Sequence, residues 1–94
     1  MATLLGDDEI RERLAGLPGW RRSGAAIVKT FEFAGFPDAV AFVTRLVAPA
    51  EAADHHPDVE IHYRRVVVSF STHSAGGLTS LDFDGAASAD EAAR

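Results

Sequence analysis

The stretch Val59-Glu-Ile-His-Tyr-Arg-Arg-Val-Val-Val-Ser-Phe-Ser-Thr-His73 decides the fold. It holds two runs of β-branched and aromatic residues, which predict an antiparallel hairpin with Arg64-Arg65 at its turn. Because side chains alternate between the two faces of a strand, we expect one face of the second run to point into the core. The residues of this face are Val66, Val68, Phe70 and Thr72. His73 falls on the opposite face.

A long helix is predicted before this hairpin. From Phe36 onward, apolar residues recur at spacings of three and four, as on one face of a helix. Pro49 lies inside the pattern and removes one backbone hydrogen bond, so we expect a kink or an irregular last turn. Pro57 disfavours helical geometry at the residue before it, which predicts that the helix ends at about His55. If the helix persists that far, Glu51 and His55 share one of its faces.

Another hairpin is predicted ahead of this helix. Residues 27–33 read as a strand, and Ser23-Gly24 is typical of the turn that precedes it. A first helix is expected to be capped by Asp7 or Asp8 and to end at Leu17-Pro18-Gly19. The sequence thus predicts a helix and two strands before the long helix.

The last helix is expected to begin at Thr79, with Asp82 three residues later in the position of a capping box. The complete order is helix, strand, strand, helix, strand, strand, helix. Two hairpins joined by a helix predict an α+β fold, a four-stranded antiparallel sheet with three helices packed on one face. A chain of 94 residues is expected to form a single domain spanning residues 1–94.

Composition narrows the possible functions. The net charge of −5 gives no reason to expect a nucleic acid as partner, and no apolar run approaches the ~20 residues that span a bilayer. There is no cysteine, which excludes disulfides and thiolate metal sites. The first residues lack the pattern of a signal peptide, so we expect a cytoplasmic protein.

Three histidines are the candidate chemical groups. His55 and His56 stand where the long helix ends, and His73 is expected to close a strand, so the three imidazoles could converge. They could hold zinc, but adjacent histidines rarely reach one metal, and metal-free proton transfer on a small heterocycle is the stronger alternative. If the histidines transfer protons, Glu51 could orient His55 or hold a substrate N–H group. A purely structural cluster is the third possibility.

Two further residues have competing interpretations. A carboxylate at a helix N-terminus is stabilising by itself, which is sufficient to explain Asp82. Trp20 could line a ligand site, but packing in the core is the favoured interpretation.

Taken together, the pattern Glu51-x3-His55-His56-Pro57-x5-Tyr63-x9-His73-x8-Asp82 resembles the signature of the pterin-4a-carbinolamine dehydratases. The flanking segments agree, among them Gly19-Trp20, Ser71-Thr72-His73 and Gly76-Gly77-Leu78-Thr79. The resemblance covers residues from about 5 to 90. A composite motif of this length is far more specific than a histidine pair.

The resemblance implies an enzyme that dehydrates 4a-hydroxytetrahydrobiopterin to quinonoid dihydropterin without cofactor or metal. It implies that His55, His56 and His73 form the pterin pocket and perform the acid/base catalysis. The residues expected to support them or the substrate are Glu51, Asp82, Trp20 and Thr72. A homodimer or homotetramer is implied as well. The alternative is a non-catalytic dimerisation or assembly scaffold on the same fold.

Leu81 and Pro49 depart from the family's pattern. Many relatives carry a basic or polar residue where Leu81 stands, so we expect one polar contact to the substrate to be missing. The alanine-rich last helix argues against tetramer formation through helices.

Overall fold

The computed structural model describes residues 2–94, so Met1, at which the predicted domain begins, lies outside the described range. The elements in chain order are α1 (Asp7–Ala15), β1 (Arg21–Ser23), β2 (Ala26–Glu32), α2 (Phe36–Ala53), β3 (Asp58–His62), β4 (Arg65–Phe70), the short 3₁₀ helix η1 (His73–Ala75) and α3 (Ser80–Ala92). The four strands form one antiparallel sheet in the order β1-β2-β4-β3. The predicted α+β fold and its element order are confirmed.

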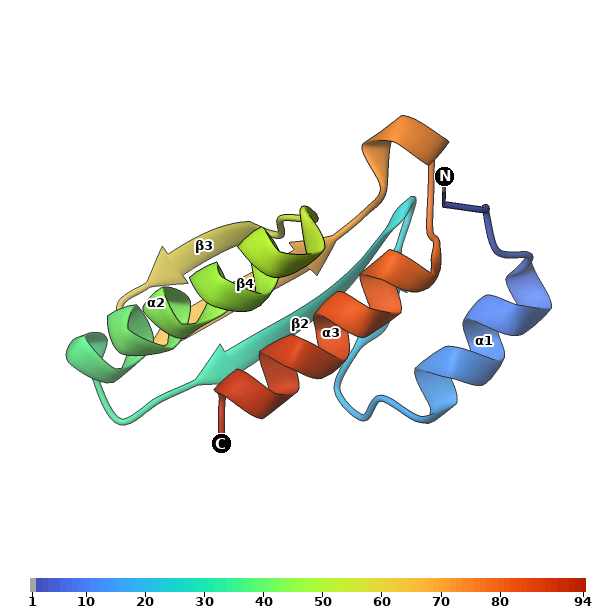
Figure 1. The fold of residues 1–94 in the computed structure, drawn as a ribbon. Coiled ribbons are helices and arrows are strands. Elements are labelled where there is room, and N and C mark those ends of the chain that lie inside the picture. Colours follow the sequence, from blue (N-terminus) through green and yellow to red (C-terminus); the bar gives the residue numbers. More distant parts are fainter. Residues whose placement is uncertain (1) are drawn as a thin grey trace.

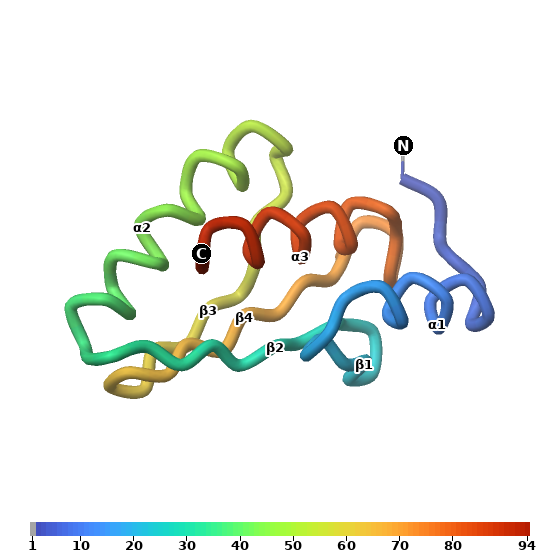
Figure 2. Tube along the Cα trace, turned by 90° about the horizontal axis from the view of Figure 1, so that it is seen from below, coloured from blue at the N-terminus to red at the C-terminus, as the bar shows by residue number. Residues whose placement is uncertain are grey.

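Two of the helices cover one face of the sheet (Figure 1). A view turned by 90° shows α2 and α3 on the same side of the strands, while α1 lies beyond them near the start of α3 (Figure 2). The Arg13 guanidinium of α1 lies 5.7 Å from the centroid of the Phe83 ring of α3. Ile10 of α1 is buried with the rest of the core. Helix α1 therefore packs against the end of the helical layer.

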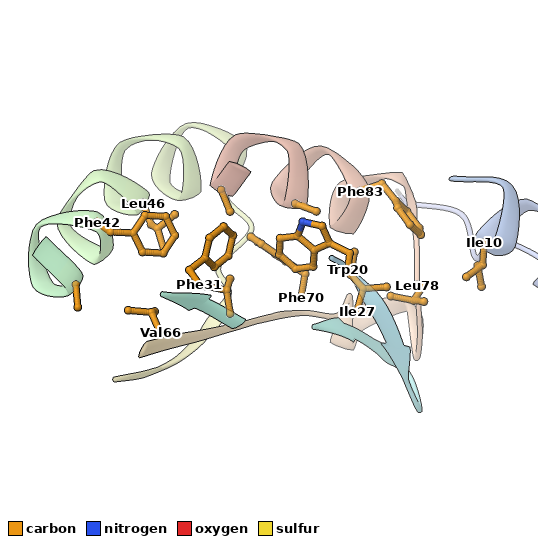
Figure 3. Close-up of a cluster of buried hydrophobic side chains, with 14 residues drawn as sticks. Ile10, Trp20, Ile27, Phe31, Phe42, Leu46, Val66, Phe70, Leu78 and Phe83 are labelled. Atoms are coloured by element: carbon orange, nitrogen blue, oxygen red, sulfur yellow. The ribbon is translucent and has the colours of Figure 1, made fainter. Parts of the chain in front are cut away.

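The core fills the space between the sheet and the two covering helices (Figure 3). The predicted core face is confirmed, since Val66, Val68 and Phe70 of β4 are buried and so is Thr72, which follows the strand. Aromatic rings contact one another across this layer, with the centroids of Phe31 and Phe42 4.7 Å apart and their planes tilted by 40°. A close approach of helix and sheet occurs at Gly85 of α3, where an added Cβ would lie 2.5 Å from Phe70 Cε1.

The second hairpin turns one residue earlier than predicted. His62 pairs with Arg65, so the turn is Tyr63-Arg64, and Tyr63 adopts a left-handed conformation at φ 55°. Strand β4 ends at Phe70, and Thr72 instead forms an isolated bridge with Gly77. The prediction that His73 ends a strand is therefore wrong.

The helix boundaries also differ in detail. The N-cap of α1 is Gly6 rather than Asp7 or Asp8, whose carboxylates lie in the first turn and favour the helix dipole from there. A hydrogen bond from Arg22 lowers the pKa of Asp7. Helix α2 continues past Pro49 but ends at Ala53, two residues before the predicted end. The predicted capping box of Thr79 and Asp82 is confirmed.

No helix in residues 2–94 is long and apolar enough to cross a membrane.

Candidate functional site

His55 and Asp82 form a buried pair between α2 and α3. Helix α2 stops at the left-handed residue Asp54, at φ 49°, and this turn directs the chain so that His55 faces α3. His55 Nε2 lies 2.6 Å from Asp82 Oδ1, and the two side chains are 10% and 0% exposed. An imidazole held by a buried carboxylate is a common component of acid/base sites.

The second oxygen of Asp82 binds two further donors. The Thr72 hydroxyl donates to Asp82 Oδ2 at 2.8 Å, and the Thr79 backbone N–H donates to the same atom at 2.9 Å. The hydroxyls of Thr72 and Thr79 are themselves 2.7 Å apart. Asp82, Thr72 and Thr79 are all buried, and the described residues contain no buried side-chain nitrogen or oxygen without a partner. Asp82, Thr72 and Thr79 therefore form a fully bonded polar network within the apolar core.

A small hollow of about 60 Å³ lies beside His55, between α2 and α3. Its lining is mostly apolar and includes Leu46, Pro49 and Leu81. The ring of Phe70 also lines it, stacked on the His55 ring with the centroids 6.0 Å apart and the planes at 22°. A flat heterocycle could place one edge here against the imidazole.

His56 lies on a different surface from its neighbour. Its Nε2 lies 2.5 Å from Glu51 Oε2, and both side chains are more than half exposed. His56 and Glu51 line a shallow apolar groove between α2 and β3, together with Val47 and Val59. Of the two roles predicted for Glu51, orienting His55 is wrong, because Glu51 pairs with His56 and the partner of His55 is Asp82 instead. Holding a substrate N–H group stays a prediction.

The remaining candidates are more scattered. His73 is exposed on η1, directly after Thr72. Trp20 is buried in the core and donates from Nε1 to both oxygens of Asp90 at 3.1 Å, which confirms the packing interpretation. Its predicted contact with substrate stays a prediction. The structure thus brings together His55, Thr72 and Asp82.

Two contributors to this site are not among the residues that the sequence predicts for it. The sequence indicates only a helix cap at Thr79, although the Thr79 hydroxyl also binds Thr72. Gly85 lines the hollow and allows Phe70 to approach α3. The sequence signal for this close approach is a glycine inside a helix. No group of three histidine or acidic side chains within residues 2–94 is arranged to hold a metal ion.

Comparisons with known proteins all point to the same protein family. A family model described as pterin 4 alpha carbinolamine dehydratase matches residues 3–92. A relative from Roseiflexus castenholzii, whose name refers to this enzyme, is 57% identical over 91 residues, covering 97% of this chain and 98% of the relative. A similarly named relative from Picosynechococcus is 50% identical over 91 residues, covering 97% of this chain and 99% of the relative.

Solved structures agree in fold. A crystal structure titled as a transcriptional coactivator/pterin dehydratase from Brucella melitensis has a TM-score of 0.91 and 36% identity, covering 96% of this chain and 98% of that one. A pterin dehydratase-like protein, described as a RuBisCO assembly factor of the alpha-carboxysome, has a TM-score of 0.67 and 24% identity, covering 80% and 89%; it shares the fold alone. On the extent and identity of these matches, this chain belongs to the pterin-4a-carbinolamine dehydratase family.

Proposed function

We propose that this protein is a hydro-lyase that removes water from 4a-hydroxytetrahydrobiopterin, or the corresponding tetrahydropterin, to give quinonoid dihydropterin in tetrahydrobiopterin recycling. The observation that carries this proposal is the buried His55–Asp82 pair beside an apolar hollow, in a member of this family. No cofactor or metal takes part in the proposed reaction.

The proposed chemistry is a coupled transfer of two protons. Hydroxide is a poor leaving group, so a protonated imidazole donates to the 4a oxygen as the C–O bond breaks, and water leaves. A neutral imidazole or a carboxylate removes the ring N–H proton, and the freed electron pair forms the new C=N bond. Histidine suits both roles because its ordinary pKa of ~6.5 makes both forms accessible near neutral pH.

We assign the acid/base groups to His55 and His73, acting on the 4a hydroxyl, with His56 helping to hold the pterin. Support for His55 comes from its position on the hollow, and support for His73 from its place directly after Thr72 of the buried network. Glu51 would act through its bond to His56. Trp20 would influence the site through the core, since its ring centroid lies 6.1 Å from that of Phe70.

We further propose that the protein works as a homodimer or homotetramer. Helix α2 carries large apolar side chains on its outer surface, with Phe36 51% and Val47 58% exposed. The neighbouring edge strand β3 adds Ile61, which is 40% exposed. A second copy would cover this surface. The cytoplasmic location and the single domain spanning residues 1–94 stay predictions, testable by cell fractionation and by limited proteolysis.

A stopped-flow assay with freshly generated 4a-hydroxytetrahydropterin tests the function. The wild type is expected to accelerate the spontaneous dehydration, and His55→Gln and His73→Ala are each expected to lose about 10²-fold or more of that acceleration. His62→Gln is the matched control, because His62 is half exposed, pairs with Glu60 and lies outside the motif, so its rate should be unchanged. A folded wild type without acceleration would refute the enzyme and favour a scaffold.

A further inference from the structure

The hydrogen bonds around Asp82 have a determined direction. An ionised carboxylate only accepts, so Thr72 must give its single hydroxyl proton to Asp82 Oδ2. The contact between the two threonine hydroxyls must then run from Thr79 to Thr72. The Thr79 oxygen in turn accepts the backbone N–H of Leu81 at 3.3 Å. The chain of donors therefore points one way, from the first turn of α3 through both threonines to Asp82.

The same donor and acceptor roles also decide which atom carries the proton in the contact between His55 and Asp82. With Oδ2 of Asp82 bound to the Thr72 hydroxyl and the Thr79 N–H, Oδ1 is the acceptor for His55. The proton on the imidazole must then lie on Nε2, which leaves Nδ1 as the nitrogen that can exchange a proton with a ligand. Nδ1 makes no hydrogen bond to any residue from 2 to 94, and the ring lines the hollow.

We propose that Thr72 and Thr79 are positioning residues that act through Asp82 to hold His55 with its proton on Nε2 and with Nδ1 facing the substrate. The tautomer follows from the network around Asp82 in its ionised form, whereas its use on a pterin rests on the proposed function. When Nδ1 takes up a proton, the Nε2–H···carboxylate bond is retained and the imidazolium is paired with Asp82. When Nδ1 releases that proton, no other bond of the network changes.

An isosteric change at Asp82 gives a sharp test. In Asp82→Asn one side of the carboxylate becomes an NH₂ group. The Thr79 backbone N–H is a fixed donor, so the amide must keep its oxygen on the Oδ2 side and turn its NH₂ toward His55. Nε2 must then accept, and the imidazole proton must move to Nδ1. The proposal therefore predicts that this substitution inverts the tautomer of His55.

The measurement is ¹⁵N NMR of histidine-labelled protein near pH 8, where imidazoles are mostly neutral. The His55 signals are assigned by their loss in His55→Gln. The wild type is expected to show protonated Nε2 and unprotonated Nδ1, and Asp82→Asn the reverse. Protonated Nδ1 in the wild type, or an unchanged tautomer in folded Asp82→Asn, would overturn the proposal. The wild-type result stands even if the variant does not fold.

Substitutions at Thr72 give a second test. Thr72→Val removes one anchor of the carboxylate, so the Nε2 proton of His55 should exchange with water at least about 10-fold faster, and kcat should fall about 10-fold at unchanged KM, the loss expected for one hydrogen bond. Thr72→Ser should restore both within about two-fold. Thr44→Val is the control, since Thr44 lies on the exposed side of α2 and binds only the Val40 carbonyl.

The two kinds of readout separate the two hypotheses. If the tautomer inverts but the wild type shows no dehydratase activity, the proposed function fails and the positioning network stands. If the enzyme is active but Thr72→Val leaves the Nε2 proton exchange and kcat unchanged, the positioning role is refuted and the function stands.

Discussion

At the scale of single residues, Asp90 illustrates how one carboxylate joins three parts of the chain. It accepts a hydrogen bond from the Trp20 indole and forms an ion pair with Lys29, with 2.8 Å between Lys29 Nζ and Asp90 Oδ1. Trp20 precedes β1, Lys29 lies in β2 and Asp90 lies near the end of α3. Because Trp20 is buried, removal of the acceptor leaves an indole N–H without a partner in the core.

We expect Asp90→Ala to lower the free energy of unfolding by about 2–3 kcal/mol, most of it from the unpaired indole N–H and the lost partner of Lys29. The neighbouring Glu91 is the control, since its ion pair with Arg94 is exposed and Glu91→Ala should change stability by less than about 0.5 kcal/mol. Urea unfolding followed by fluorescence measures both. Equal effects of the two substitutions would contradict the assigned role of Asp90.

At the scale of elements, α3 lies close to the sheet because Gly85 has no side chain. Alanine has the higher helix propensity, by about 1 kcal/mol, so propensity alone favours Gly85→Ala. A Cβ at this position would however lie within 2.8 Å of three atoms of the Phe70 ring. Phe70 also stacks on His55, so any shift of this ring is transmitted to the site.

We expect Gly85→Ala to destabilise the protein by about 1–3 kcal/mol, because the clash outweighs the gain in propensity. It should also lower the dehydratase rate through Phe70 and His55. Gly16→Ala is the matched control, since Gly16 has φ −90° and its added Cβ would meet only a carbonyl at 3.6 Å. Thermal unfolding and the stopped-flow assay test both effects; a stabilised Gly85→Ala variant would show that the helix can move away without cost.

At the scale of the whole molecule, the apolar outer surface of α2 is the feature that a lone chain does not bury. Val47 and Leu4 are similarly exposed, at 58% and 54%, but only Val47 lies on this surface. We expect sedimentation velocity to show a dimer or tetramer for the wild type, and Val47→Glu to shift it toward the monomer. Leu4→Glu should leave the assembly unchanged. A wild type that is monomeric at all concentrations would refute the proposed oligomer.

Features that depend on local sequence patterns could be predicted, whereas features that depend on tertiary packing could not. The strands and helices were predictable because their apolar periodicities are local, and the alternation from Val66 to Phe70 gave the core face correctly. The capping box was predictable because Thr79 and Asp82 are three residues apart. The ends of helices and strands were predicted less accurately. Left-handed residues such as Asp54 and Tyr63 end these segments, and whether a residue adopts this unfavourable backbone conformation depends on tertiary packing.

The sequence by itself therefore determined the α+β order, the family signature and the candidate histidines. Only the tertiary structure decided which partner each histidine takes: Asp82, 27 residues away, binds His55, whereas Glu51 binds His56. The physical reason is that helix α2 stops at Ala53 and the chain then turns through Asp54, so the two adjacent imidazoles leave the backbone toward different surfaces. Such pairing depends on where whole elements pack, and spacing along the chain does not encode it.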